Sequence, residues 1–93
     1  MVVRLTPRLC RAARALAGLE QKDLAAASDV SKSTIGAFEI KDEGARLATR
    51  TNRALIEAFE RAGIQFIPEN GGGPGVRLQQ PVRSHLSDNP QSD

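Results

Sequence analysis

Two short stretches of the chain, residues 21–27 and 32–40, each place their apolar residues on one side of a helix, and only a brief turn separates them. Leu24 and Ala25 are the inward residues of the first stretch, and Ile35 and Phe38 are inward in the second. The outward side of the second stretch is made of small and polar groups: Lys32, Ser33, Gly36 and Ala37. The sequence therefore predicts two short helices, the second of which exposes a face of small and polar residues.

Local signals mark the turn and an earlier helix. Asp29 tolerates the left-handed backbone conformation of a turn, and Ser31 is a favourable N-cap for the second helix. Thr6 as N-cap and Gly18 as left-handed C-cap delimit a helix over residues 7–17, with a proline at its first position, where its missing N–H costs nothing. Its periodicity turns Cys10, Ala13, Arg14 and Ala17 inward and leaves Arg8 and Arg11 outward.

The second half of the chain predicts one more helix and a hairpin. Residues 41–48 have no clear period and should form a loop, after which Thr49 or Thr51 can cap a helix that runs to Ala62. The apolar stripe of this helix consists of Leu55, Ala58, Phe59 and Ala62. Residues 64–67 and 76–78 change to the alternating period of a strand and flank the turn-rich PENGGGPG, which predicts a β-hairpin. The polar end of the chain should be disordered.

Composition excludes several classes of site. With one cysteine and one histidine, Cys10 and His85, the chain can form neither an intramolecular disulfide nor a zinc site, and we expect no metal and no cofactor. The apolar stretches are far shorter than the roughly 20 residues that span a bilayer, so we expect a cytoplasmic protein without membrane contact.

No catalytic residues are expected either. The glycine-rich residues 71–75 lack the Lys and Ser/Thr of a phosphate-binding loop, and no helix follows them. Ser84 and His85 fall in the predicted tail, where nothing places a base beside a nucleophile. The sequence thus favours a protein that is not an enzyme, and Cys10 is expected in the core as a small apolar residue.

The segment QKDLAAASDVSKSTIGAFE resembles the helix-turn-helix of the Cro/C1-type, or XRE, family of phage-repressor-like proteins. Eight positions agree with the family pattern Q-x-x-L-A-x-x-x-G-V-S-x-x-T-I-x-x-x-E: Gln21, Leu24, Ala25, Val30, Ser31, Thr34, Ile35 and Glu39. Asp29 departs from it by replacing the usual turn glycine, and Glu20 departs by replacing a small polar cap. The likeness extends less specifically over residues 6–63.

What the resemblance implies is an interface with double-stranded DNA, in which the second helix of the motif enters the major groove. Gln21 would contact a phosphate or a base edge, Lys32, Ser33 and Ala37 would face bases, and Ser31 and Thr34 would lie near the backbone. The resemblance also pairs Arg14 with Glu39. This pair explains why the helix over residues 7–17 has a charged residue on its inward side. We expect this pair to be structural and not to read DNA.

Charge is unevenly distributed, although the net charge is only +2. Residues 1–19 contain four arginines and no acid, whereas residues 20–43 contain more acids than bases. Asp42 and Glu43 should repel phosphate, so positive charge near the motif must come from Lys41, Arg46 and Arg50. We expect modest affinity from one domain, and therefore a homodimer on two half-sites about 34 Å apart.

These observations predict a mostly α fold, a small four-helix domain like that of lambda repressor with a C-terminal β-hairpin and a disordered tail. The helix-turn-helix domain would cover 6–63, with the motif at 21–39 and the recognition helix at about 32–40, followed by a hairpin extension at 64–79 and the tail at 80–93.

The predicted function is that of a bacterial or phage transcriptional regulator, a repressor or autoregulator that is nucleoid-associated when bound to DNA. The alternative is a protein-interaction module, antitoxin-like or a co-regulator, that binds a protein partner through the hairpin.

Overall fold

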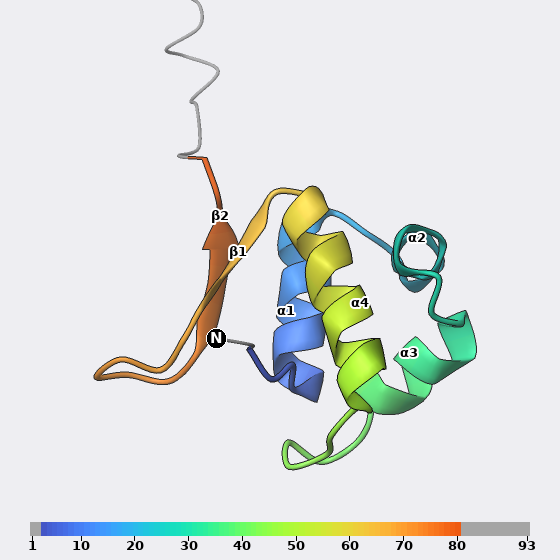
Figure 1. Ribbon diagram of the computed structural model, residues 1–93, viewed down its shortest axis with the longest axis horizontal. Coiled ribbons are helices and arrows are strands. Elements are labelled where there is room, and N and C mark those ends of the chain that lie inside the picture. Colours follow the sequence, from blue (N-terminus) through green and yellow to red (C-terminus); the bar gives the residue numbers. More distant parts are fainter. Residues whose placement is uncertain (1–2, 81–93) are drawn as a thin grey trace, which may run out of the picture.

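The computed structural model describes residues 3–80. Along the chain, the elements are α1 (Pro7–Ala17), α2 (Gln21–Ser28), α3 (Lys32–Glu39), α4 (Thr49–Arg61), β1 (Ile64–Ile67) and β2 (Gly75–Leu78). Four helices and one antiparallel hairpin confirm the predicted fold class (Figure 1). The predicted tail, apart from Gln80, lies outside the described residues, as do Ser84 and His85.

Helix α1 begins and ends where its sequence signals place it. The Thr6 side chain accepts a hydrogen bond from the backbone N–H of Leu9 at 3.1 Å, and Pro7 occupies the first helical position. Gly18 ends the helix with a φ of 73°, a left-handed conformation that a side chain would strain.

The turn between α2 and α3 is held by two polar residues. Asp29 adopts a φ of 63°, so the turn is retained without glycine. Ser31 caps α3, because its hydroxyl accepts a hydrogen bond from the backbone N–H of Thr34 at 3.1 Å. Helix α3 ends at Glu39, one residue before the predicted end.

Helix α4 differs from the prediction at both ends. Its N-cap is Ala48, without a side-chain cap, so Thr49 and Thr51 lie inside the helix. Ala62, predicted inward, is exposed because it follows the last helical turn as the C-cap. The buried polar residue Asn52 was not predicted.

Asn52 is buried because it binds the extended segment that precedes α1. Its side-chain oxygen accepts from the backbone N–H of Leu5 at 2.8 Å, and its amide nitrogen donates to the carbonyl of Val3 at 2.8 Å. Both polar atoms of the amide are therefore satisfied inside the protein. This contact fixes Leu5, which is fully buried, in the core.

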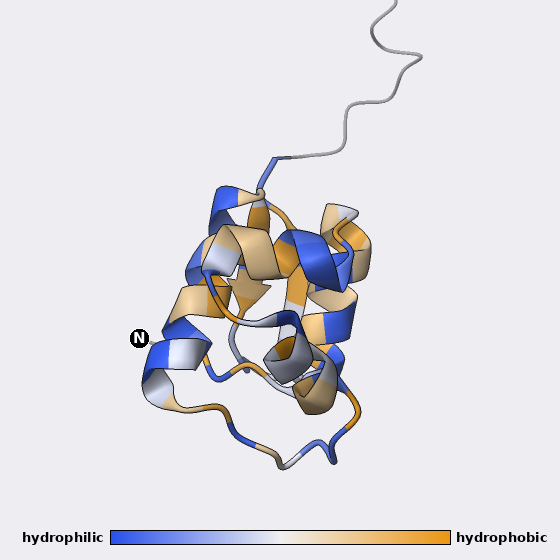
Figure 2. Cartoon of the chain, turned by 90° about the vertical axis from the view of Figure 1, so that its right-hand side faces the viewer, coloured by the Kyte–Doolittle hydropathy of each residue, from blue (hydrophilic) through white to orange (hydrophobic). Residues whose placement is uncertain are grey.

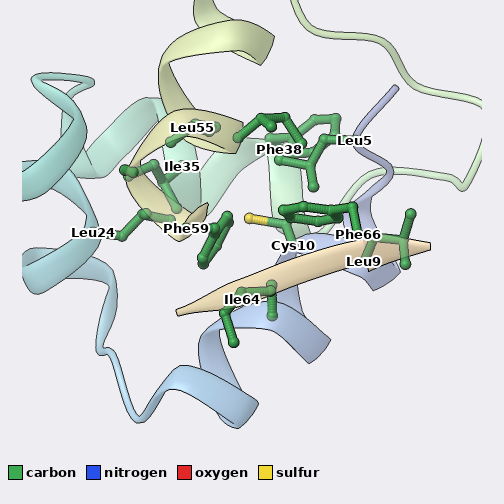
Figure 3. Packing of buried hydrophobic residues seen from close by; sticks show 13 residues of the cluster. Leu5, Leu9, Cys10, Leu24, Ile35, Phe38, Leu55, Phe59, Ile64 and Phe66 are labelled. Atoms are coloured by element: carbon green, nitrogen blue, oxygen red, sulfur yellow. The ribbon is translucent and has the colours of Figure 1, made fainter. Parts of the chain in front are cut away.

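The hairpin shares the hydrophobic core with the helices. Its strands pair in the register Ile64 with Leu78 and Phe66 with Val76, and the two residues from β1 are buried. The ring of Phe66 packs edge-on against Phe59 of α4, with 5.8 Å between ring centroids. Figure 3 shows these side chains around Cys10. The hairpin thus covers α1 and α4 on the side opposite α2 and α3 (Figure 1).

Within residues 3–80, no helix has the length and apolarity needed to cross a membrane. Over the same range, the acidic, cysteine and histidine side chains nowhere gather in threes as a metal ion would require.

Candidate nucleic-acid interface

Helix α3 has one side in the core and one side in solvent. Ile35, Phe38 and Glu39 are buried, whereas Lys32, Ser33 and Ala37 are exposed, as the periodicity of the sequence predicts. Figure 2 views the molecule from the side on which α2 and α3 lie, with the loop after α3 along the lower edge. The outward side of α3 is thus exposed at Lys32, Ser33 and Ala37 and half-buried at Gly36.

Glu39 connects α3 to α1 through a bidentate ion pair. Arg14 donates from Nε to Glu39 Oε2 at 2.7 Å and from Nη2 to Oε1 at 2.8 Å. The Glu39 side chain is only 3% exposed and that of Arg14 is 21% exposed. Two parallel hydrogen bonds fix both the distance and the orientation of the partners. The expected partners Arg14 and Glu39 therefore meet at the junction of the two helices.

Two further donors complete the coordination of Glu39. Gln21 Nε2 donates to Oε1 at 3.0 Å, and the Cys10 thiol donates to Oε2 at 3.1 Å. Burial opposes ionisation of Glu39, but the hydrogen bonds from Arg14, Gln21 and Cys10 outweigh it and lower the pKa of the carboxyl. The carboxylate is therefore charged and satisfied at neutral pH.

The backbone at the end of α3 is held as well. Arg11 donates from Nη1 to the backbone carbonyl of Glu39, and Arg14 donates from Nη1 to the carbonyl of Leu19 at 3.1 Å. Arg11 is exposed, as predicted, yet its guanidinium binds the last residue of α3. The periodicity predicts only that Arg11 points away from the core, so this contact has no signal in the sequence.

Cys10 is a buried core residue that also donates to a carboxylate. Burial is the main reason that the pKa of its thiol is raised far above the usual value, and the hydrogen bond to Glu39 raises it further. The thiol is therefore protonated and unreactive at neutral pH, because the thiolate is the nucleophilic form.

Gln21 lies in this network and against α3. A Cβ atom at Gly36 would come within 3.3 Å of the Gln21 side-chain oxygen, so the missing side chain at Gly36 leaves room for Gln21. The sequence predicts a DNA contact for Gln21, but in the structure its amide nitrogen is used by Glu39.

The remaining residues expected to contact DNA are all exposed, and most of them lie on α3. Those on α3 and its N-cap are Ser31, Lys32, Ser33, Thr34 and Ala37, and all five are exposed. The Ser31 hydroxyl also donates to Thr34 Oγ1 at 2.7 Å, so both hydroxyls take part in the cap. Lys41 and Arg46 are exposed in the loop that follows.

Comparison with known families agrees with this geometry. The profile of a helix-turn-helix family matches residues 11–44, which span α2, the turn, α3 and most of α1. This segment is a Cro/C1-type helix-turn-helix. It is a DNA-binding motif, so the resemblance seen in the sequence is confirmed. No match to the chain is found among curated proteins.

The first turn of the helix-turn-helix contains acidic residues whose charge is partly engaged. The Asp23 carboxylate accepts from the backbone N–H of Glu20 at 2.9 Å, which helps to cap α2. Lys22 Nζ lies 3.8 Å from the Glu20 carboxylate, and both side chains are largely exposed. Glu20 therefore stands at the surface beside the start of α2, where we expect it to disfavour a nearby phosphate.

At the end of the helix-turn-helix, Glu43 binds the N-terminus of α1. Its Oε1 accepts from the backbone N–H of Arg8 at 3.2 Å and lies 3.8 Å from the Arg8 side chain. A hydrogen bond from Thr6 and these contacts lower the pKa of Glu43. From the sequence, Glu43 is expected only to repel phosphate. In the structure, it also binds the N-terminus of α1 and so connects the loop to that helix.

A signal for this contact is present in the sequence. Thr6 accepts from the N–H of Leu9, and because the first turn of α1 contains no acidic residue, the N–H of Arg8 needs an acceptor from elsewhere. Sequence alone does not say which carboxylate fills that role, because Glu43 is 35 positions away from Arg8 along the chain.

Proposed function

We propose that the protein is a sequence-specific regulator of transcription that places α3 in the major groove of double-stranded DNA. The observation that carries this proposal is the outward side of α3. It is exposed at Lys32, Ser33 and Ala37, while the inward side is fixed by buried residues that include the carboxylate of Glu39. A helix held in this way fits the major groove, which is about 12 Å wide.

The exposed groups match the chemistry of base edges and phosphates. Lys32 can donate to guanine O6 and N7, Ser33 can bond either kind of base edge, and the Ala37 methyl can pack on thymine. Ser31 and Thr34, at the start of α3, lie where helix N-termini bind phosphate. Gln21 stays within hydrogen-bonding reach of Glu39 and presents its side-chain oxygen beside Gly36.

Positive charge for phosphate binding comes from outside α2 and α3. Lys41 and Arg46 are exposed in the loop after α3, and Arg50 is exposed in the first turn of α4. Because Glu43 already binds the N-terminus of α1, part of its negative charge is offset. Lysines and arginines placed in this way displace counterions from DNA and make binding dependent on salt.

We further propose a homodimer that binds an inverted repeat and acts as a repressor or autoregulator in the cytoplasm. Within residues 3–80, β2 pairs only with β1, so its other edge has no strand partner in this range. Val76 and Leu78 of this strand pack against the core and are half-buried, so part of each side chain is left for a subunit contact. A two-fold axis at β2 would join two subunits through an antiparallel pair of identical strands.

Selection of bound duplexes from a random DNA pool tests the proposal. We expect an inverted repeat whose half-sites are one helical turn apart, with affinity that falls log-linearly with salt, at a slope near −0.9 per phosphate contact. Lys32→Gln should relax the preference at one base pair. Arg46→Gln should weaken all sequences equally and reduce the salt slope by about 1.

The competing function is that of a protein-interaction module, which this edge of β2 would also serve. It predicts no enriched duplex and no salt-dependent binding of DNA. Recovery of random sequences only, from a folded protein, would contradict the proposed regulator and favour the interaction module.

A further inference from the structure

The most exposed large apolar side chain among residues 3–80 is Ile40, which is 86% exposed. The other exposed large apolar residue in this range, Leu16 on α1, is 40% exposed. Ile40 directly follows the last residue of α3. Its neighbour Glu39 points the other way, into the protein, and is buried.

Ile40 continues the outward side of α3. Its φ of −100° and ψ of 3° keep it close to the helical path, although it is formally the C-cap. Counted along the helix, it lies seven residues after Ser33, four after Gly36 and three after Ala37, which is the spacing of one helix face. Ile40 therefore continues the row of Ser33, Gly36 and Ala37, of which Ser33, Ala37 and Ile40 are exposed and Gly36 is half-buried beside Gln21.

The backbone that carries Ile40 is fixed from both sides. Arg14 holds the side chain of Glu39, and Arg11 binds its carbonyl. After Ile40, the backbone N–H of Lys41 donates to the carbonyl of Phe38 at 3.1 Å. The side chain is thus presented on a rigid support, which is what a base-reading contact requires.

The chemistry of this row favours an apolar partner in the groove. Gly36, Ala37 and Ile40 carry no side-chain donor or acceptor, and Ser33 supplies a single hydroxyl. In the major groove, the apolar group on a base edge is the 5-methyl of thymine. The exposed cation Lys41 follows Ile40 and attracts phosphate, whereas the exposed Asp42 after it opposes phosphate. The position of Ile40 on the same helix face as Ser33 and Ala37 is therefore what favours DNA as the group that covers it.

We propose that Ile40 contacts the 5-methyl group of one thymine in each half-site and determines specificity at that base pair. The inference depends on the proposed function, since it requires α3 in the major groove. It adds a specificity residue beyond the helix-turn-helix positions expected from the sequence, because α3 was expected to read bases through Lys32, Ser33 and Ala37.

The test replaces each thymine of the selected duplex by deoxyuridine, which removes only the methyl group. Besides any thymine that Ala37 contacts, we expect one position per half-site at which deoxyuridine weakens binding of the unaltered protein about fourfold, the effect of one buried methyl group. Ile40→Ala should bind the thymine duplex more weakly and show no further loss with deoxyuridine at that position. Leu16→Ala, the matched control, should keep the fourfold response.

The outcomes separate this inference from the proposed function. Failure to enrich any duplex, with a folded protein, overturns both. An enriched duplex at which deoxyuridine has the same effect on Ile40→Ala as on the unaltered protein overturns only the role of Ile40. Loss of dimer in Ile40→Ala by light scattering, with methyl sensitivity unchanged, also overturns that role and places Ile40 at a subunit contact.

Discussion

Two carboxylates near the end of α3 bind α1, and they do so in opposite environments. Glu39 is buried and accepts hydrogen bonds from Arg14, Gln21 and Cys10. Glu43, four residues later, has a side chain that is 42% exposed, and it binds the backbone N–H of Arg8. The pKa of each carboxyl is lowered, but only Glu39 would leave a buried polar cluster unsatisfied if it were removed.

This difference separates two tasks within one motif. Loss of one partner from a buried ion pair strongly destabilises the fold, because the remaining charge stays out of water. Loss of an exposed pair costs little, because water replaces the partner. We therefore expect Glu39 to determine whether α3 stays docked, and Glu43 to determine where the loop with Lys41 and Arg46 lies.

Arg14→Ala should give the largest effect, a loss of about 3 to 5 kcal/mol in the free energy of unfolding, because Glu39 stays buried without its cation. Urea unfolding followed by far-UV circular dichroism measures the loss. Arg8→Ala, which removes the side-chain partner of Glu43, is the matched control and should change stability by less than about 1 kcal/mol. Equal losses of unfolding free energy in the two variants would show that Glu39 and Glu43 do not differ in their contribution to stability.

A double variant sharpens this result. Replacing Arg14 and Glu39 together by methionine removes both charges, so no buried charge remains unpaired. We expect this variant to be closer in stability to the unaltered protein than Arg14→Ala is. A double variant as unstable as the single one would assign the loss to packing and not to the orphaned carboxylate.

Acid should remove the contribution of ionised Glu39 to the free energy of unfolding. Its pKa in the folded protein lies below the usual value of 4.5, so its stabilisation is fully present above that pH. The contribution disappears as the pH falls through the folded pKa. Urea midpoints between pH 7 and pH 2 should therefore show the unaltered protein and Glu39→Gln converging in acid.

Glu43→Gln is the control for the pH series. Because Glu43 is exposed, this variant should keep most of the acid dependence of the unaltered protein. If Glu39→Gln loses stability in acid as steeply as the unaltered protein, the acid sensitivity arises elsewhere in the chain.

Gln21→Ala should have an intermediate effect, a destabilisation of about 1 kcal/mol, because one hydrogen bond to Glu39 is lost. Lys22→Ala, at the neighbouring exposed position, should leave the unfolding midpoint unchanged. Thermal unfolding compares the two variants. An unchanged midpoint in Gln21→Ala, together with weaker DNA binding, would show that Gln21 serves DNA directly and not the junction.

The fold could be predicted closely because its signals are local. Thr6, Gly18 and Ser31 mark helix ends through backbone geometry that neighbouring residues determine, and the helix boundaries agree with the structure to within about a residue. The fourth helix was less well predicted. Thr49 and Thr51 are good capping residues, yet the helix begins after Ala48 without a side-chain cap.

The site could be predicted only in part, because much of it depends on contacts between distant segments. Periodicity turns Arg14 inward, but its partner Glu39 was expected from a family resemblance and not from spacing. The contacts of Asn52 with Val3 and Leu5, and of Glu43 with Arg8, join positions more than 30 residues apart. Hydropathy marks these polar residues as solvent-facing, so their structural roles have no local pattern.

The smallest expected effect concerns Glu43 and decides between repulsion of phosphate and support of the loop. Glu43→Ala should change stability by less than about 1 kcal/mol. Asp42→Ala removes a neighbouring exposed charge without cutting the contact to α1, so it should tighten DNA binding. Glu43→Ala removes the same charge but frees the loop, and we expect a smaller gain or a loss.

Affinity for the selected duplex, measured for both variants at one salt concentration, decides the matter. Amide hydrogen exchange in residues 41–48 supplies a second measurement, since the loop should exchange faster in Glu43→Ala than in Asp42→Ala. If Glu43→Ala and Asp42→Ala gain the same affinity and exchange at the same rate, Glu43 acts on DNA binding only through its negative charge. The contrast with Glu39 would then lie in burial alone, because the exposed carboxylate would have no positioning role.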